Sequence, residues 1–171
     1  LDAMKNAFYM AATAQEQAPI LLGALRQNML QLSAEHANGA HPYFVPPAHT
    51  AWAREILGPD AWLCPEQMLL LETDAQRART IARAHMATYT GLDNYKNNLK
   101  QFGFVEADFD NGGSDKLVDA IFGWGDEKAL RARLQAHWDA GANHVCIQTF
   151  KDEIERGPDL ALLELLAPLN P

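Results

Sequence analysis

Four short apolar runs divide the chain and predict its strands. They span 19–25 (PILLGAL), 40–45 (AHPYFV), 66–72 (EQMLLLE) and 144–150 (HVCIQTF). Each run is continuous and does not alternate between apolar and polar residues, which is typical of strands buried on both faces of a parallel sheet. We therefore expect parallel strands at these four positions.

Segments with helical period lie between and after these runs. Apolar residues spaced by three and four positions predict helices over 29–37, 49–57, 73–89, 92–102, 114–122, 126–140 and 159–169. Thr73 and Gln76 have the spacing of a capping box at the start of the third of these helices. Because strands alternate with helices, the pattern predicts an α/β fold with parallel strands and right-handed crossovers.

The length of 171 residues fits a single α/β domain over 1–171. A net charge of −8 with scattered lysines and arginines argues against nucleic acid and anionic membranes as partners. No apolar run is long enough to span a membrane, and no signal peptide is evident. With Cys64 and Cys146 in or beside apolar runs, we expect reduced thiols and a cytoplasmic location. The first residue is Leu1, which suggests a start lost to processing or truncation.

Four parallel strands leave a structural question open. A four-stranded sheet with helices on one face exposes its other face and both edge strands. Either helices cover both faces, as in a doubly wound sheet, or the strands are part of a closed barrel. The pattern of apolar positions does not choose between these architectures.

Three long segments resemble the luciferase-like monooxygenase superfamily, and most closely its oxidoreductases that use coenzyme F-420 (F420). They are PILLGALRQNMLQLSAEHANGAHPYFV (19–45), ILGPDAWLCPEQMLLLETDAQRARTIAR (56–83) and WGDEKALRARLQAHWDAGANHVCIQTF (124–150). Members of that family are eight-stranded β/α barrels about twice as long. The resemblance implies a partial TIM-type barrel, formed by strands five to eight, with a helical insertion (73–122) before the last strand. The N-terminal half of the barrel, strands one to four, would be absent from this chain.

The resemblance also implies a cofactor site. Family members bind the cofactor phosphate with the loop that follows the first strand here, where a helix N-terminus favours an anion. The cofactor-binding candidates are Ala24, Leu25, Arg26, Gln27 and His41. The family commonly carries Gly-Pro at the positions of Arg26 and Gln27, so an ordinary loop with a solvated arginine remains the alternative. His41, beside a proline in an apolar run, has a hydrogen-bonded core histidine as its alternative.

Side chains at or near strand ends give the candidates for a substrate pocket, because barrel active sites lie at the C-terminal ends of the strands. They are Tyr43, Glu66, Gln148 and Thr149, with His49 placed at the pocket mouth. A carboxylate in a closed pocket acquires a raised pKa and serves as an acid or base. The alternative for Glu66 is a strand-entry residue bonded to backbone. The histidines lack metal-ligand spacing, so we expect no metal site.

The resemblance implies an oxidoreductase that transfers a hydride between a deazaflavin, coenzyme F-420, and a small organic substrate. FMN is the alternative cofactor, with oxygen as the acceptor in the monooxygenase branch of the family. The alternative function is a catalytically silent half-barrel that acts as a self-associating scaffold. In either case the open sheet predicts a homodimer, or association with a missing N-terminal half.

Overall fold

The computed structural model describes residues 18–151 and 157–167, together with Ala3, Phe8 and Met10. The described chain forms six strands, and every strand pair is parallel. The strands are β1 (Leu21–Leu22), β2 (Gly39–Ala40), β3 (Trp62–Leu63), β4 (Glu66–Leu71), β5 (Phe122–Gly125) and β6 (Cys146–Phe150). They form two three-stranded sheets, ordered β1-β2-β3 and β5-β4-β6. The predicted α/β fold with parallel strands is confirmed.

The two sheets are joined because β3 and β4 are separated only by Cys64 and Pro65. On one side of this segment, the Cys64 N–H donates to Ala40 O over 2.9 Å. On the other side, the Cys146 N–H donates to Pro65 O over 2.9 Å. The hydrogen bonds therefore link β1, β2, the β3–β4 segment and β6 in that order, and β5 pairs with β4 on the edge opposite β6.

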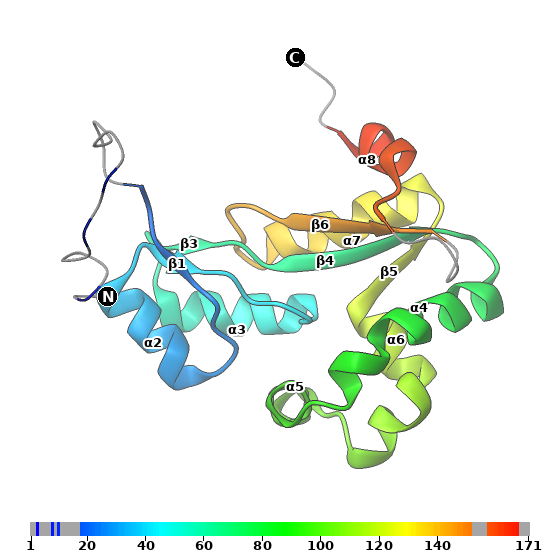
Figure 1. Cartoon of the computed structure of the whole chain (residues 1–171), viewed down its shortest axis with the longest axis horizontal. Helices are drawn as coiled ribbons and strands as arrows, with labels where there is room; N and C mark the ends of the chain where they lie inside the picture. Colours follow the sequence, from blue (N-terminus) through cyan, green and yellow to red (C-terminus); the bar gives the residue numbers. More distant parts are fainter. Residues whose placement is uncertain (1–2, 4–7, 9, 11–17, 152–156, 168–171) are drawn as a thin grey trace.

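The helices fall into two groups (Figure 1). One group packs along the strands: α2 (Gln27–His36), α3 (Pro47–Leu57), α7 (Glu127–Asp139) and α8 (Leu160–Leu166). The other group forms the insertion between β4 and β5: α4 (Ala75–Thr90), α5 (Asp93–Leu99), the 3-10 helices η1 (Lys100–Phe102) and η2 (Glu106–Gly112), and α6 (Asp115–Ile121). None of the helices described is long and apolar enough to cross a bilayer.

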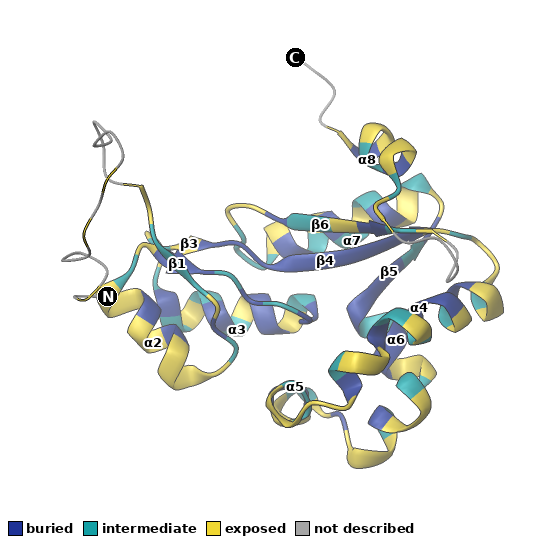
Figure 2. Cartoon of the chain, viewed as in Figure 1, coloured by how far each residue is buried: buried dark blue, intermediate teal, exposed yellow. Residues whose placement is uncertain are grey.

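Side chains along the β3–β4 segment point alternately to the two faces of the sheet. We call the face covered by α2, α3 and α7 the helical face and the opposite one the inner face. Leu63 packs against a cluster of residues from α2 and α3, and Leu69 packs against Leu130 and Leu134 of α7. Cys64, Glu66 and Met68 alternate with these leucines and point to the inner face. Met68 is covered there by the helical insertion. Figure 2 shows β4 as buried along almost its whole length.

A buried polar network ties the helical face to the sheet. His137 on α7 donates through Nε2 to Gln67 Oε1 (3.0 Å), and its Nδ1 accepts from the Thr50 hydroxyl (2.8 Å). The Gln67 amide in turn donates to Ile121 O over 2.8 Å. Burial, and then the nearby Arg133 charge, lower the pKa of His137 to about 4, so the ring is neutral at pH 7. The network thus locks α3, α7 and β4 together.

The fold differs from the sequence prediction in several details. Six strands are present where we expected four, because neither β3 nor β5 was predicted. The N-cap of α4 is Asp74, whose side chain accepts the Arg77 N–H, so the capping box assigned to Thr73 is wrong. The helix expected over 114–122 ends at Ile121, and Phe122 begins β5, a strand that we did not predict. In that strand Phe122 lies opposite Met68, which pairs β5 with β4.

Candidate functional site

Polar side chains from three neighbouring segments meet on the inner face of the sheet. The Tyr43 hydroxyl, just beyond β2, donates to Gln148 Oε1 on β6 over 3.0 Å. With its proton used there, the Tyr43 oxygen accepts from the hydroxyl of Tyr89 on α4, 2.9 Å away. Burial, the hydrogen bond to Tyr89 and the nearby Glu66 raise the pKa of Tyr43, so its hydroxyl is neutral.

Glu66 is the most unusual member of this group. Its carboxyl is almost fully buried, with 3% of the residue exposed. Oε2 accepts the Phe44 N–H at 3.3 Å, whereas Oε1 has no hydrogen-bond partner in the part of the chain that the structure describes. Burial raises the pKa of Glu66 to about 8, and the Phe44 N–H opposes this only partly. The carboxyl is therefore mainly protonated at neutral pH.

A strained turn presents the Phe44 N–H to Glu66. Phe44 has a φ of 59°, in the left-handed region that is costly for a residue with a side chain. Its buried ring stacks on Tyr89 at 5.0 Å and meets the edge of Tyr95 at 5.5 Å. These contacts hold the turn in place, and they also cover Glu66 from the side of the insertion.

His41, two residues before Tyr43, lies on the same face and forms part of the wall of a groove. The groove has a volume of about 440 Å³ and is lined by Leu21, His41, Trp62, Cys64, His144 and Cys146. His41 Nδ1 donates to Cys64 O over 2.6 Å, and Nε2 is the ring nitrogen left for another partner. Burial raises the pKa of both thiols, so they line the groove as neutral, soft apolar groups.

The loop after β1 leads into the N-terminus of α2. Arg26 is the N-cap residue and has extended backbone geometry, and no side chain caps the first turn. Arg26 and Gln27 are exposed, whereas Ala24 is buried in the cluster on the helical face. The first N–H groups of α2 and the Arg26 guanidinium are thus available to an anion.

His49 fixes this loop from the neighbouring helix. Its Nε2 donates to Leu25 O over 2.8 Å, and its ring contacts Trp52 and Phe102, each at a centroid distance of 5.5 Å. Burial lowers the pKa of His49 to about 4, against the effect of the bond to Leu25. His49 is therefore a buried, neutral residue of α3 and does not lie at a pocket mouth, where we had expected it.

The structure brings four of the nine site candidates together on the inner face: His41, Tyr43, Glu66 and Gln148. The loop candidates, Ala24 to Gln27, lie at the end of β1 as predicted from their position. Thr149 does not join the pocket group. Its hydroxyl donates to Asp159 O over 2.9 Å on the helical face, because successive residues of a strand point to opposite faces. Sequence reasoning missed Tyr89, whose helical spacing indicated only a packing role.

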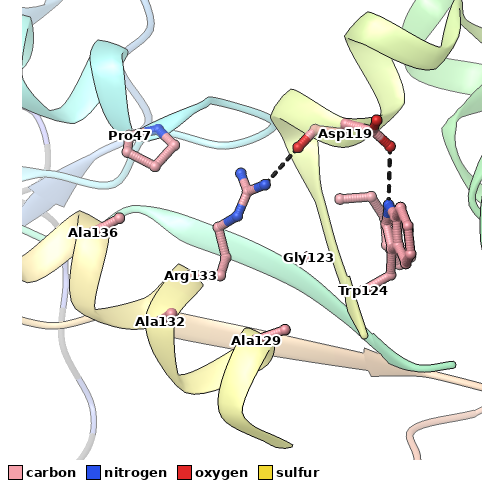
Figure 3. A pocket seen from close by; sticks show the side chains of 9 residues that line it. Pro47, Asp119, Gly123, Trp124, Ala129, Ala132, Arg133 and Ala136 are labelled. Atoms are coloured by element: carbon pink, nitrogen blue, oxygen red, sulfur yellow. Dashed lines mark hydrogen bonds between the residues drawn. The ribbon is translucent and has the colours of Figure 1, made fainter. Parts of the chain in front are cut away.

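A second hollow of about 540 Å³ lies between α7, β5 and the start of α3 (Figure 3). Arg133 points into it and donates to Ala120 O (2.7 Å) and Asp119 O, two carbonyls in the last turn of α6. The Asp119 carboxylate accepts from the Trp124 indole N–H over 3.0 Å. These bonds satisfy the polar groups of the hollow, so the arrangement is structural. The described residues contain no group of three or more side chains placed to hold a metal ion.

No protein-family model matches the chain, and no curated protein matches it. Solved structures do. An F420-dependent secondary alcohol dehydrogenase in complex with an F420-acetone adduct matches with a TM-score of 0.57 and 10% identity, over 79% of this chain and 44% of that protein. The coenzyme F420-dependent tetrahydromethanopterin reductase from Methanopyrus kandleri matches with a TM-score of 0.61 and 17% identity, over 88% and 49%. Apo-MsnO8 matches with a TM-score of 0.51 and 16% identity, over 85% and 49%.

The chain shares their fold. It spans about half the length of each of these proteins, as the shares of 44% and 49% show. At identities of 10% to 17% the likeness concerns the fold alone. The parallel strands and this shared fold are consistent with the partial α/β barrel that we expected from the sequence. The assignment to strands five to eight stays a prediction.

Proposed function

We propose that this chain belongs to an oxidoreductase that transfers a hydride between coenzyme F420 and a small organic substrate. The observation that carries the proposal is the meeting of Tyr43, Glu66 and Gln148 on the inner face of the sheet. Their segments are neighbours in a fold shared with two F420-dependent enzymes. Convergent polar groups in a partly apolar hollow are the usual form of a small-molecule site.

The loop after β1 fits the phosphate of such a cofactor. The N-terminus of α2 has no side-chain cap, and Arg26 lies exposed beside it. A Cβ added to Gly23 would meet no atom within 4 Å, so the loop has open space next to it. Backbone N–H groups near Gln27 and the Arg26 guanidinium would hold the phosphate, with His41 nearer the ring. When bound, the deazaflavin supplies the hydride-bearing ring, and FMN is the alternative cofactor.

The aromatic cluster above Glu66 would keep water from the reacting atoms. Tyr43, Tyr89 and Tyr95 lie within 6.5 Å of each other, measured between ring centroids. The groove on the same face is open near Trp62, which is 50% exposed. A small organic substrate would enter from the open side and orient on Gln148 and Tyr43.

A second set of strands is needed to close the inner face. Among the described residues, β1 and β6 each pair with a single strand, which leaves one edge of each without a partner strand in that part of the chain. We propose that a second copy of the chain, or a further segment of the same protein, supplies these strands. In both cases the proposed substrate is a small molecule. A self-associating scaffold without catalysis is the second candidate function. Sedimentation at several concentrations tests self-association, and a monomer at all of them contradicts a second copy.

Cofactor titration tests the main proposal. Purified protein is titrated with F420, FMN and riboflavin while their fluorescence is followed. Riboflavin is the matched control, because it has the flavin ring of FMN without the phosphate. We expect F420 to bind most tightly, with a dissociation constant on the order of micromolar, as for ordinary enzyme substrates. Riboflavin should bind most weakly. Absence of binding by both F420 and FMN would leave the scaffold as the better explanation.

A further inference from the structure

The buried Glu66 Oε1 lacks a partner that a folded protein normally provides. Leaving a buried acceptor or donor unpaired costs about 1–3 kcal/mol, so such atoms usually have a protein, water or ligand partner. Glu66 Oε2 is already fixed by the Phe44 N–H at 3.3 Å. Oε1 has no partner among the described residues. One oxygen is thus held in place while the other is left for a group that is not part of this fold.

Glu66 lies on the inner face beside the groove, behind two of the residues that line it. Cys146 is directly opposite Glu66 in the pairing of β4 with β6, and Cys64 precedes it by two positions on the same face. Both cysteines line the groove. A small molecule in the groove therefore lies against the two thiols that flank Glu66, and it contacts the carboxyl when this wall opens, because Oε1 itself is buried.

The surroundings of Glu66 keep its proton in place. The titratable groups that face it are Tyr43, Tyr95 and Cys146, and all three are neutral at pH 7 because their pKa values are raised. Among the residues that the structure describes, no cationic side chain contributes to the pKa of Glu66. A carboxyl in such a site stays a carboxylic acid, which donates a hydrogen bond as well as a proton.

We propose that Glu66 donates the proton to the oxygen or nitrogen atom of the substrate whose carbon receives the hydride. The inference rests on the proposed function, which supplies the reduced cofactor. The hydride brings its electron pair to the substrate carbon and forms the new C–H bond. The π pair of the C=O or C=N bond moves to the heteroatom, which takes the Glu66 proton, and the broken O–H bond leaves a carboxylate. In the reverse direction the carboxylate accepts the same proton.

This role favours a carbonyl or imine substrate over an alkene. A protonated Glu66 forms a hydrogen bond to a carbonyl oxygen or imine nitrogen before the reaction, which satisfies the unpaired Oε1. An alkene carbon offers no such acceptor. The neutral thiols and Trp62 that line the groove suit the apolar remainder of a small ketone.

Infrared spectroscopy with Glu66→Gln tests the contact without cofactor. The spectra of wild type and the variant are compared at about pH 6, where a group with the raised pKa of Glu66 holds its proton. The band of interest is the C=O stretch of the protonated carboxyl. The two proteins are then titrated with cyclohexanone. We expect a carboxylic-acid band that is lost in Glu66→Gln and that shifts to lower frequency when the ketone binds. Absence of the band, or a band that cyclohexanone leaves unmoved, overturns the proposal.

Reduction of cyclohexanone by reduced F420 gives the second readout. Glu66→Gln keeps the size of the side chain, so we expect F420 affinity within about two-fold of wild type and a turnover number lower by about 100-fold or more. Glu127→Gln on the outer face of α7 is the matched control and should retain wild-type turnover. Undiminished turnover in Glu66→Gln would refute the role. If F420 and FMN both fail to bind wild type, the proposed function falls, and the infrared titration alone decides on Glu66.

Discussion

Thr50 and His137 lie 87 positions apart in the chain, and a hydrogen bond of 2.8 Å joins Thr50 Oγ1 to His137 Nδ1. Because Nε2 of the same ring donates to Gln67 Oε1, the proton on Nδ1 is absent and the hydroxyl must be the donor. Both residues are fully buried. The bond therefore fixes the tautomer of His137 and the distance between α3 and α7.

Thr50→Val should destabilise the protein although the shape of the side chain is kept. The substitution leaves Nδ1 of His137 buried without a donor, which costs about 1–3 kcal/mol of unfolding free energy. Urea denaturation measures the loss. Thr80→Val is the matched control, since the Thr80 hydroxyl bonds Gln76 O on the exposed side of α4. The control should change the unfolding free energy by less than about 0.5 kcal/mol. Equal losses in the two variants would show that the buried Thr50 bond stabilises the protein no more than the exposed Thr80 bond.

Acid should destabilise the protein through its two buried histidines. The pKa values of His49 and His137 are lowered from 6.5 to about 4 in the folded state. The unfolded chain then binds more protons between these values, so the stabilisation is complete above pH 6.5 and is lost as the pH falls towards 4. Urea denaturation at about pH 7.5, 6 and 5 should show this decrease superimposed on the opposite contribution of Glu66, so it is read as the difference between wild type and a histidine variant. His137→Gln should flatten the decrease, whereas replacement of the exposed His36 should leave it unchanged.

Gly141→Ala should be costly because both the backbone and the space around it require glycine. Its φ is +96°, and a Cβ there would lie 2.8 Å from Arg54 Cγ. Arg54 is held by its bond to Gly141 O (2.9 Å), so it cannot easily withdraw. We expect a loss of about 1–3 kcal/mol, measured as thermal or urea unfolding. Gly91→Ala is the control, since φ there is −86° and the nearest atom is 3.6 Å away; a similar loss in both variants would contradict this reason.

The periodicity of apolar residues predicted most of the strands and helices, because it depends on which face of each element is buried. The runs 66–72 and 144–150 correspond to β4 and β6, and Asp126–Ala140 corresponds to α7 with its cap. β5 escaped prediction because Phe122 continues the apolar spacing of α6. Its pairing with Met68 depends on a contact distant in the sequence.

Part of the candidate site was also predicted from the pattern of buried positions along the strands. Strand position placed His41, Tyr43, Glu66 and Gln148 near strand ends, and alternation within β6 would already have separated Gln148 from Thr149. The cover over Glu66 comes from Tyr89 and Tyr95, whose helical spacing shows only that one face of each helix is buried. Which strand that face covers is decided by the tertiary fold. The raised pKa of Glu66 follows from this burial. The sequence therefore predicted an acid or base at Glu66 only as one of two alternatives.

Arg26→Ala should weaken binding of phosphate-bearing cofactors. If the guanidinium contributes one charge-assisted hydrogen bond, its loss costs about 1.5–3 kcal/mol, or about ten-fold or more in the dissociation constant. Fluorescence titration with F420 and FMN measures the change. Riboflavin, which has no phosphate, should bind both proteins equally. Lys128→Ala removes the same charge from the exposed side of α7 and should not affect the titration; an equal effect of both variants would point to net charge alone.

Glu66→Gln should alter stability in alkaline solution, opposite to the histidines. The pKa of Glu66 is raised from 4.5 to about 8 in the folded state, so the folded chain binds more protons between these values. Its contribution is complete below pH 4.5 and is lost as the pH rises towards 8, by at most about 1.4 kcal/mol per pH unit. Urea unfolding at about pH 5, 6.5 and 8 should show that the free-energy difference between wild type and Glu66→Gln falls as the pH rises, because the histidines contribute equally to both proteins. Glu106→Gln serves as the control, because the pKa of this exposed carboxyl, paired with Lys96 and Lys100, is lowered to about 2 and lies below the tested range. Identical pH profiles for wild type and Glu66→Gln would mean that Glu66 is ionised in the folded protein.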